Sequence, residues 1–193
     1  MEKIRSFIAI ELPPEIKLEL ARLQDSLKED GQPRIKWVNP QSIHLTLKFL
    51  GNIDPAVVGG ITKAMTDATS TTPPFTLDLR HPGAFPNLER VQVVWVGLGG
   101  ELEVLKKLQQ SLENNLAELG FPPEKRSFKP HLTLARMGDE ATTQQRQRLG
   151  ELIADTKFET SRKIKTNAIN LIRSQLTRTG AVYSHIGSAA LSG

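Results

Sequence analysis

The tetrapeptide His-Leu-Thr-Leu occurs twice in the chain, at residues 44–47 and 131–134. In a shuffled sequence of the same composition, two of the four histidines would be followed by Leu-Thr-Leu with a probability of roughly 10⁻⁵. A shared preference for strands raises that figure, but the repeat still needs an explanation. It indicates an internal duplication, and the similar order of predicted elements around the two copies supports this interpretation.

Both copies are predicted to lie on strands, where successive side chains alternate between two faces. His44 and Thr46 then project from one face of the first strand, and its two leucines project from the other. His131 and Thr133 share a face of the second strand in the same way. Each copy therefore supplies two leucines to the core and presents an imidazole and a hydroxyl on the opposite face.

Two imidazoles and two hydroxyls, related by an approximate two-fold axis, suit in-line displacement at phosphorus. In that reaction one group takes a proton from the nucleophile, and another gives a proton to the leaving oxygen. Imidazole titrates near neutral pH, so one copy could act as the base and the other as the acid. Thr46 and Thr133 would donate hydrogen bonds to the non-bridging phosphate oxygens. A single H-x-T would instead be an ordinary part of a half-exposed strand.

The composition disfavours several other kinds of site. The chain of 193 residues has no cysteine, which removes disulfides, thiolate metal sites and a cysteine nucleophile. A zinc site is disfavoured because only two histidines face the proposed site and no carboxylate lies at a ligand-like spacing. We therefore expect neither a metal nor another cofactor. The net charge of +4 favours anionic ligands such as phosphates or RNA.

Nothing in the sequence predicts export or insertion into a membrane. The short apolar run near the N-terminus meets Glu11 and two prolines, and it lacks the cleavage site of a signal peptide. No stretch approaches the ~18 apolar residues that span a bilayer. We expect a soluble, cytoplasmic protein that forms a single domain over residues 1–193.

Hydrophobic periodicity predicts the α+β class, with antiparallel sheets and two similar halves. The continuous β-branched and aromatic run at residues 91–98 is typical of a central strand. The expected strands are residues 5–12, 35–38, 43–50, 75–79, 91–98, 131–136, 164–176 and 181–186. The expected helices are residues 13–31, 55–69, 102–119 and 142–153, and the expected loops include residues 81–90 and 121–130.

The motifs and their surroundings resemble a known family. The sequence is similar to the 2H phosphoesterase superfamily, named for paired H-x-T-x motifs, and more narrowly to the RNA 2′,3′-cyclic phosphodiesterases, also called bacterial and archaeal 2′-5′ RNA ligases. The matching segments span nearly the whole chain and read RSFIAIELP, IKWVNPQSIHLTLKFLG, GAFP, VVWVGL, FKPHLTLAR and LIRSQLTRTGAVY. The resemblance implies a bilobal fold, duplicated about a pseudo-two-fold axis, in which antiparallel sheets line a central cleft and helices lie outside.

The resemblance also implies roles for the motif residues. His44 would give a proton to the leaving 3′ oxygen and His131 would activate water, so that an RNA 2′,3′-cyclic phosphate end opens to a 2′-phosphomonoester. Thr46 and Thr133 would hold the phosphate. The residues alone do not decide which histidine is the acid. We expect a monomer whose partner is RNA or an oligonucleotide with a cyclic phosphate end.

Four further residues are candidates for substrate binding. Lys48 is four residues after His44, so regular alternation places the two side chains on the same face of the strand. Lys48 would then either line the cleft or be a solvated lysine. Phe49 and Arg136 each follow a motif histidine by five residues and resemble positions where the family holds the terminal base and the phosphate. Strict alternation would put both on the leucine face, so their use requires a strand end or a bulge. Arg126 lies in the basic loop 125–129, which would contact either the RNA backbone or solvent.

Three alternatives stay open at this stage. ATP-independent 2′-5′ ligation of tRNA-like halves would use the same groups in reverse, although water is the far more abundant nucleophile. A non-catalytic RNA-binding module would keep the fold, but two intact H-x-T pairs argue against such decay. A small nucleotide could also be the substrate, because nothing in the sequence sets the length of the ligand. His81 and His185 lack the H-x-T context and are interpreted as structural or exposed.

Overall fold

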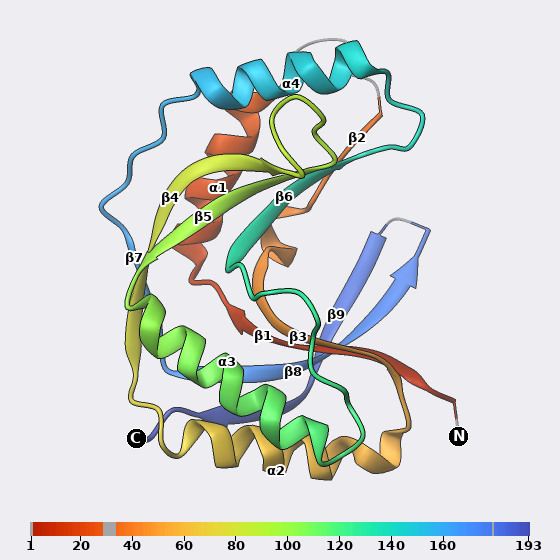
Figure 1. The fold of residues 1–193 in the computed structure, drawn as a ribbon, viewed down its shortest axis with the longest axis vertical. Coiled ribbons are helices and arrows are strands. Elements are labelled where there is room, and N and C mark those ends of the chain that lie inside the picture. Colours follow the sequence, from red (N-terminus) through yellow and green to blue (C-terminus); the bar gives the residue numbers. More distant parts are fainter. Residues whose placement is uncertain (1, 29–33, 179) are drawn as a thin grey trace.

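The computed structural model describes residues 2–28, 34–178 and 180–193. Its first sheet combines strands from both ends of the chain. The N-terminal strand β1 lies between β3 and the C-terminal strand β8. The four strands run antiparallel in the order β3-β1-β8-β9 (Figure 1). Their bounds are Ile4–Glu11 for β1, His44–Ile53 for β3, Ala168–Thr177 for β8 and Gly180–Ala190 for β9.

The second sheet has five antiparallel strands in the order β2-β6-β5-β4-β7. Their bounds are Ile35–Trp37 for β2, Phe75–Phe85 for β4, Val93–Gly100 for β5, His131–Met137 for β6 and Lys163–Thr166 for β7. β5 occupies the centre, as its continuous apolar sequence predicted. The order β6-β5-β4-β7 corresponds to the order β3-β1-β8-β9 of the first sheet, so each sheet carries one copy of the motif on an equivalent strand.

The helices follow from their apolar spacing. α1 begins at Pro14, where the missing N–H of proline costs no hydrogen bond, and it buries Ile16, Leu20 and Leu27 on one side. The expected end of this helix near Gly31 lies outside the described residues. The bounds are Pro14–Leu27 for α1, Val58–Thr69 for α2, Leu102–Ala117 for α3 and Thr143–Asp155 for α4, with short 3₁₀ helices η1 at Pro40–Ser42 and η2 at Pro55–Val57.

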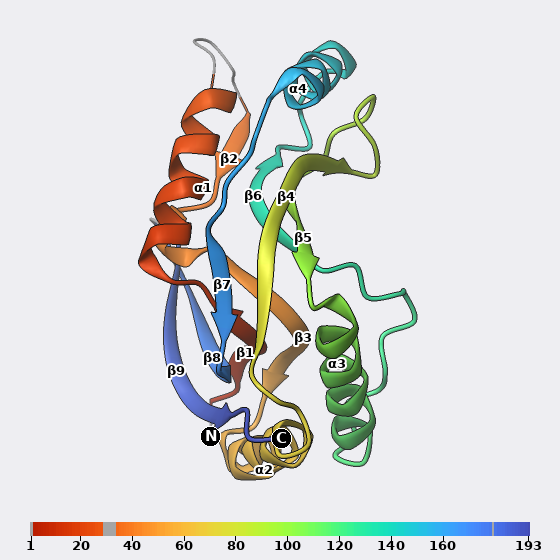
Figure 2. The same cartoon turned by 90° about the vertical axis from the view of Figure 1, so that its left-hand side faces the viewer.

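The helices are exchanged between the sheets. α1 follows β1 of the first sheet, yet the side-chain amide of Gln24 donates hydrogen bonds to the carbonyls of Val38 and Leu134, beside and within β6. α3 follows β5 of the second sheet, yet it contacts β3 and α2 at the first sheet. α1 and α4 therefore lie with the second sheet, and α2 and α3 lie with the first (Figures 1 and 2). This exchange ties the two lobes together.

The hydrophobic core is shared by the two lobes. The four motif leucines belong to one buried cluster with the apolar faces of all four helices. A second, smaller cluster of Phe7, Ala9 and Ile172, with Tyr183 packed against it, lies apart from that core. The first sheet is therefore apolar on both faces near Phe7. One face builds the core, and the other presents aromatic side chains beside the first motif.

Several expected element boundaries differ from those in the structure. The segment 164–176, expected as one strand, is two strands in different sheets, because β7 ends at Thr166 and pairs with β4 while β8 begins at Ala168 and pairs with β1. Both parts have strand-forming sequences, so local propensity does not reveal the change of partner. β4 also continues to Phe85, which shortens the expected loop at 81–90.

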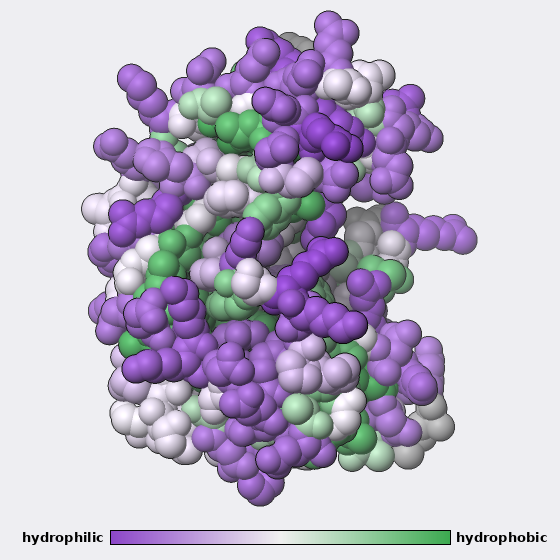
Figure 3. Space-filling model, viewed as in Figure 1, coloured by the Kyte–Doolittle hydropathy of each residue, from purple (hydrophilic) through white to green (hydrophobic). Residues whose placement is uncertain are grey.

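Hydrophilic residues cover much of the face seen in Figure 3, and hydrophobic residues reach the surface in patches between the α4 end and the α2 end. Within the described part of the chain, every helix is too short or too polar to cross a membrane.

Candidate active site

The two motif strands share one irregularity. The register between β1 and β3 skips Leu47, so that Thr46 and Lys48 pair with consecutive residues of β1. The register between β5 and β6 skips Leu134 in the same way. Such a β-bulge inserts one residue into one strand only, and it therefore reverses the alternation of side chains beyond it. Both bulges fall three residues after the motif histidine.

The bulge in β3 overturns both expectations for Lys48, which neither lines the cleft nor is solvated. Lys48 is 5% exposed, and its Nζ donates to Oε2 of Glu113 at 2.6 Å and to the carbonyl of Pro122 at 2.7 Å. Glu113 also accepts hydrogen bonds from the side-chain amide of Gln109 and the N–H of Glu124. The expectations were wrong because they assumed that side chains alternate regularly along the whole of β3. Lys48 instead ties β3 to α3 and to the loop that leads into β6.

The same bulges bring Phe49 and Arg136 to the motif face, the condition that their use required. Phe49 pairs with Phe7, and the two ring centroids lie 6.1 Å apart. Phe49 is 66% exposed, which is unusual for a phenylalanine. Arg136 pairs with Val93 near the end of β6 and is also exposed. Both side chains are accessible to a ligand, and their binding roles stay predictions.

The two motif histidines are held by the same contact. Nδ1 of His44 lies 2.8 Å from the carbonyl oxygen of Ser42, and Nδ1 of His131 lies 2.7 Å from that of Lys129. A carbonyl oxygen only accepts hydrogen bonds, so Nδ1 carries the proton and Nε2 is left for a ligand. The carbonyl partner is two residues before the histidine in both strands, and the structure therefore orients the two imidazoles in the same tautomer.

The threonines of the motifs also match each other. Thr46 and Thr133 are half-buried, and each pairs with a residue of the neighbouring strand, Ala9 and Trp95 respectively. Neither hydroxyl forms a hydrogen bond with any residue that the structure describes. A half-buried hydroxyl without a protein partner can donate to a ligand oxygen at no cost to the fold.

Aromatic rings surround His44. The ring of Phe7 stacks on the imidazole with 4.6 Å between centroids, and Tyr183 meets it edge-on at 5.4 Å. This burial lowers the pKa of His44 because the charged form loses hydration, while the hydrogen bond to Ser42 and the charge of Glu11 act in the opposite direction. The neutral imidazole is therefore favoured more than in an exposed histidine.

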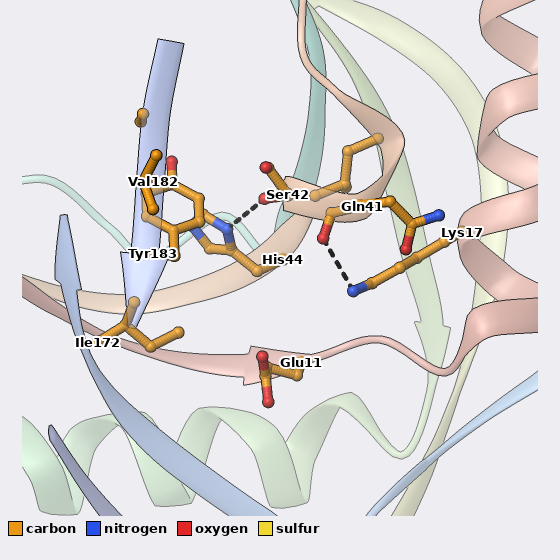
Figure 4. A pocket seen from close by; sticks show the side chains of 10 residues that line it. Glu11, Lys17, Gln41, Ser42, His44, Ile172, Val182 and Tyr183 are labelled. Atoms are coloured by element: carbon orange, nitrogen blue, oxygen red, sulfur yellow. Dashed lines mark hydrogen bonds between the residues drawn. The ribbon is translucent and has the colours of Figure 1, made fainter. Parts of the chain in front are cut away.

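A pocket of about 340 Å³ opens beside His44 (Figure 4). Glu11 and Lys17 both line it, so the pocket carries charges of both signs. The Glu11 carboxylate accepts a hydrogen bond from the Asn170 amide at 3.2 Å and lies 2.9 Å from Nε2 of His185. His185 is exposed, as its sequence context predicted, and it is also a partner of a pocket residue.

A different aromatic cluster supports the second motif. Phe85 meets His131 edge-on, with 5.0 Å between ring centroids, and Trp95 lies 5.2 Å from Phe85. Trp95 pairs with Thr133, which puts it on the motif face. The indole packs closely over Gly83, where a Cβ would overlap the ring. Glycine at this position therefore allows the tryptophan to lie flat against β4.

The strands that carry the two motifs lie next to each other. β3 and β6 contact each other although they belong to different sheets. Arg136 on β6 acts electrostatically on the phenol of Tyr183, which itself touches His44. Arg126, in contrast, is exposed on the loop before β6 and forms no ion pair or hydrogen bond with the described residues. Its predicted contact with RNA stays a prediction.

Sequence reasoning did not single out Phe7, Tyr183 or Arg5 as site residues. Arg5, Phe7 and Glu11 occupy alternate positions of β1, which is a visible pattern in the sequence. Only the pairing of β1 with β3 shows that this face adjoins the first motif. Tyr183 has no comparable local signal, because β9 meets β1 only through β8.

The environment of His44 predicts its titration. We expect NMR to show His44 titrating below the ordinary value of about 6.5. Since the unfolded chain then binds more protons than the folded chain, the free energy of unfolding should fall as the pH drops through 6.5 towards the folded pKa. Tyr183→Ala would expose one edge of the His44 imidazole to water, so the pKa of His44 should rise in that variant. A wild-type His44 that titrates at or above 6.5 would contradict this account of its burial.

Comparisons with known proteins show the family to which the chain belongs. A family model described as "LigT like Phosphoesterase" matches residues 10–95 and 99–183, and each segment contains one motif. The chain is 32% identical to the RNA 2′,3′-cyclic phosphodiesterase of Methanothermobacter thermautotrophicus over 94% of this chain and 96% of that one. It is 35% identical to the protein of the same name from Aeropyrum pernix, over 85% of this chain and 90% of that one.

The fold has close counterparts among solved structures. TT0787 of Thermus thermophilus gives a TM-score of 0.78 at 26% identity, covering 98% of both chains. Escherichia coli LigT in its apo form gives a TM-score of 0.77 at 26% identity, covering 100% of both chains. With the paired motifs, the matched family model and the shared fold in agreement, the chain belongs to the LigT-like phosphoesterase family of the 2H superfamily.

Proposed function

We propose that this protein hydrolyses RNA 2′,3′-cyclic phosphate ends to 2′-phosphomonoesters by acid–base catalysis that needs no metal. One observation carries the proposal. Each motif histidine has Nδ1 held by the carbonyl two residues before it, which leaves both Nε2 atoms for substrate. Two imidazoles prepared in the same tautomer on equivalent strands suit a reaction that needs one base and one acid. The relatives named above carry the same activity in their names.

In the proposed reaction, water attacks phosphorus in line with the bond to the 3′ oxygen. Nε2 of neutral His131 takes a proton from the water as the new P–O bond forms. The P–O3′ bond breaks, and protonated His44 gives its Nε2 proton to the departing oxygen. The products are a 2′-phosphate and a free 3′ hydroxyl, and exchange with solvent returns both histidines to their starting states.

The environment of His44 fits the role of the acid. A lowered pKa makes the protonated imidazole a stronger acid, so the proton transfers readily once the substrate is bound. Glu11, opposite His44 across β1 and β3, opposes the lowering and keeps part of the population protonated. The position opposite His131 is Gly97, so no side chain corresponds to Glu11 there.

The remaining groups bind the substrate. The hydroxyls of Thr46 and Thr133 donate to the two non-bridging oxygens, where negative charge grows in the transition state. Arg136 offsets the charge of the phosphate, and the exposed ring of Phe49 stacks on the terminal base. Arg126 extends the contact to the RNA backbone.

We further propose that the protein acts as a monomer and as a single domain. Both motifs belong to one chain, and their leucines share one core, so the proposed site is complete without a second copy. The absence of cysteine suits the reducing cytoplasm, where we place the activity.

The test is incubation of an oligoribonucleotide ending in a 2′,3′-cyclic phosphate, in buffer containing EDTA. We expect conversion to a 2′-phosphate end, identified by chromatography against 2′- and 3′-phosphate standards. An oligonucleotide that already ends in a 3′-phosphate serves as the unreactive control. A 3′-phosphate product, or RNA binding without conversion, would contradict the proposal. With paired RNA ends, joined product in excess of hydrolysed product would favour 2′-5′ ligation instead.

A further inference from the structure

Arg5 lies on the same face of β1 as Phe7, and it has no role in the chemistry above. The register of β1 with β8 is regular, and both bulges near the first motif lie on β3, so side-chain alternation along β1 is uninterrupted. Arg5 therefore shares a face with Phe7 and Glu11. Phe7 stacks on His44, which places Arg5 one side-chain step beyond the ring that adjoins the reacting groups.

Tyr183 completes a group of three polar side chains at this end of the cleft. Its ring packs edge-on against Phe7, with 5.2 Å between centroids, and its side chain is half-buried. Burial raises the pKa of Tyr183, while the positive charges of Arg5 and Arg136 act against this rise. The phenol therefore lies within electrostatic reach of two guanidinium groups, one from each sheet, and it keeps its proton to donate.

Neither Arg5 nor Arg136 forms an ion pair with a residue that the structure describes. The carboxylate on the same face, Glu11, is six positions away on β1, about 20 Å along an extended strand. Glu11 is also engaged already, with Asn170 and His185. Two unpaired guanidinium groups beside a phenol donor favour an oxyanion ligand.

We propose that Arg5 and the hydroxyl of Tyr183 bind the phosphodiester that precedes the cyclic end of the RNA, next to the cyclic phosphate that Arg136 contacts. This inference rests on the proposed function and names its substrate more closely, as an oligonucleotide end rather than a cyclic mononucleotide. The step from Phe7 to Arg5 is about 7 Å along the strand, comparable to the spacing of neighbouring phosphates in a nucleic-acid chain. A mononucleotide has no phosphate at that position, so it forgoes these contacts.

The test compares kcat/KM for a cyclic-phosphate-ended oligoribonucleotide with kcat/KM for a 2′,3′-cyclic mononucleotide. We expect the wild type to prefer the oligonucleotide. Arg5→Met keeps the apolar stem and removes the charge, so it should reduce that preference about tenfold, near the lower end of what a charged hydrogen bond contributes. Its KM for the oligonucleotide should also depend less steeply on salt, by about 0.7 in the logarithmic slope.

Two further variants separate a local contact from a general change in charge. Tyr183→Phe keeps the ring on Phe7 and His44 but removes the hydroxyl, and it should reduce the preference by a smaller factor in the same direction. Lys107→Met removes one positive charge from the exposed side of α3 and should leave the ratio unchanged. Equal losses on both substrates in Arg5→Met, or no loss on either, would overturn the subsite.

A binding measurement keeps this outcome distinct from failure of the proposed function. If the wild type hydrolyses neither substrate, the proposed function fails. Fluorescence anisotropy with an oligoribonucleotide ending in a 2′-phosphate then decides on the subsite alone. Weaker binding by Arg5→Met than by Lys107→Met supports the subsite, and equal binding overturns it.

Discussion

His44→Ala and His131→Ala should each lower kcat for a cyclic-phosphate RNA end by about 10²–10⁴-fold, the range for removal of a general acid or base. Each substitution removes an Nε2 that the backbone has already oriented through Nδ1. The double variant should lose far less than the product of the two single losses, because the imidazoles act in one proton-transfer sequence. His81→Ala, an exposed histidine outside both motifs, is the matched control.

The same variants can separate the two proposed roles. An aryl phosphodiester has a leaving group that departs without protonation. His44→Ala should therefore lose much less activity on the aryl diester than on the cyclic RNA end, and His131→Ala should lose activity on both. The reverse pattern would exchange the roles of acid and base. Near-normal activity in both single variants would remove the catalytic proposal and favour a binding module.

Lys48→Met should destabilise the protein by about 3–5 kcal/mol at neutral pH, the typical cost of removing one partner of a buried ion pair. The side chains of Lys48 and Glu113 are only 4% and 6% exposed, so water cannot replace the lost ammonium group. The carbonyl of Pro122 would lose its side-chain donor as well. The free energy of unfolding from urea titration measures the effect. A loss below about 1 kcal/mol would show that the pair is better hydrated than its burial indicates.

Two further variants test whether the loss of stability comes from the unpaired buried carboxylate or from the loss of a positive charge as such. In Lys48→Met combined with Glu113→Gln, the buried carboxylate is gone while an amide can still bond Gln109 and the N–H of Glu124, so most of the stability should return. Lys63→Met breaks the exposed pair with Asp67 on α2 and should change stability by less than about 0.5 kcal/mol. A double variant as unstable as Lys48→Met would contradict the explanation by an uncompensated charge.

Residue type, spacing and repetition determined much about this protein from the sequence alone. The motif leucines lie in the core and the motif histidines lie on the opposite face, because alternation is a local property of any strand before its first bulge. The central position of β5 followed from an apolar run that only a doubly covered strand tolerates. Regular alternation put Phe49 and Arg136 on the leucine face, and only the bulges in the structure bring them to the motif face.

Only the tertiary structure decided which partners each strand and helix meets. The bulges at Leu47 and Leu134 depend on the register with β1 and β5, and no local pattern in β3 or β6 encodes it. The expected face of β3 for Lys48 was therefore wrong. The break between β7 and β8, the exchange of α1 and α3 between the sheets and the aromatic cover on His44 have the same cause. Each depends on contacts between residues far apart in the sequence, whereas periodicity reports only the neighbours along one element.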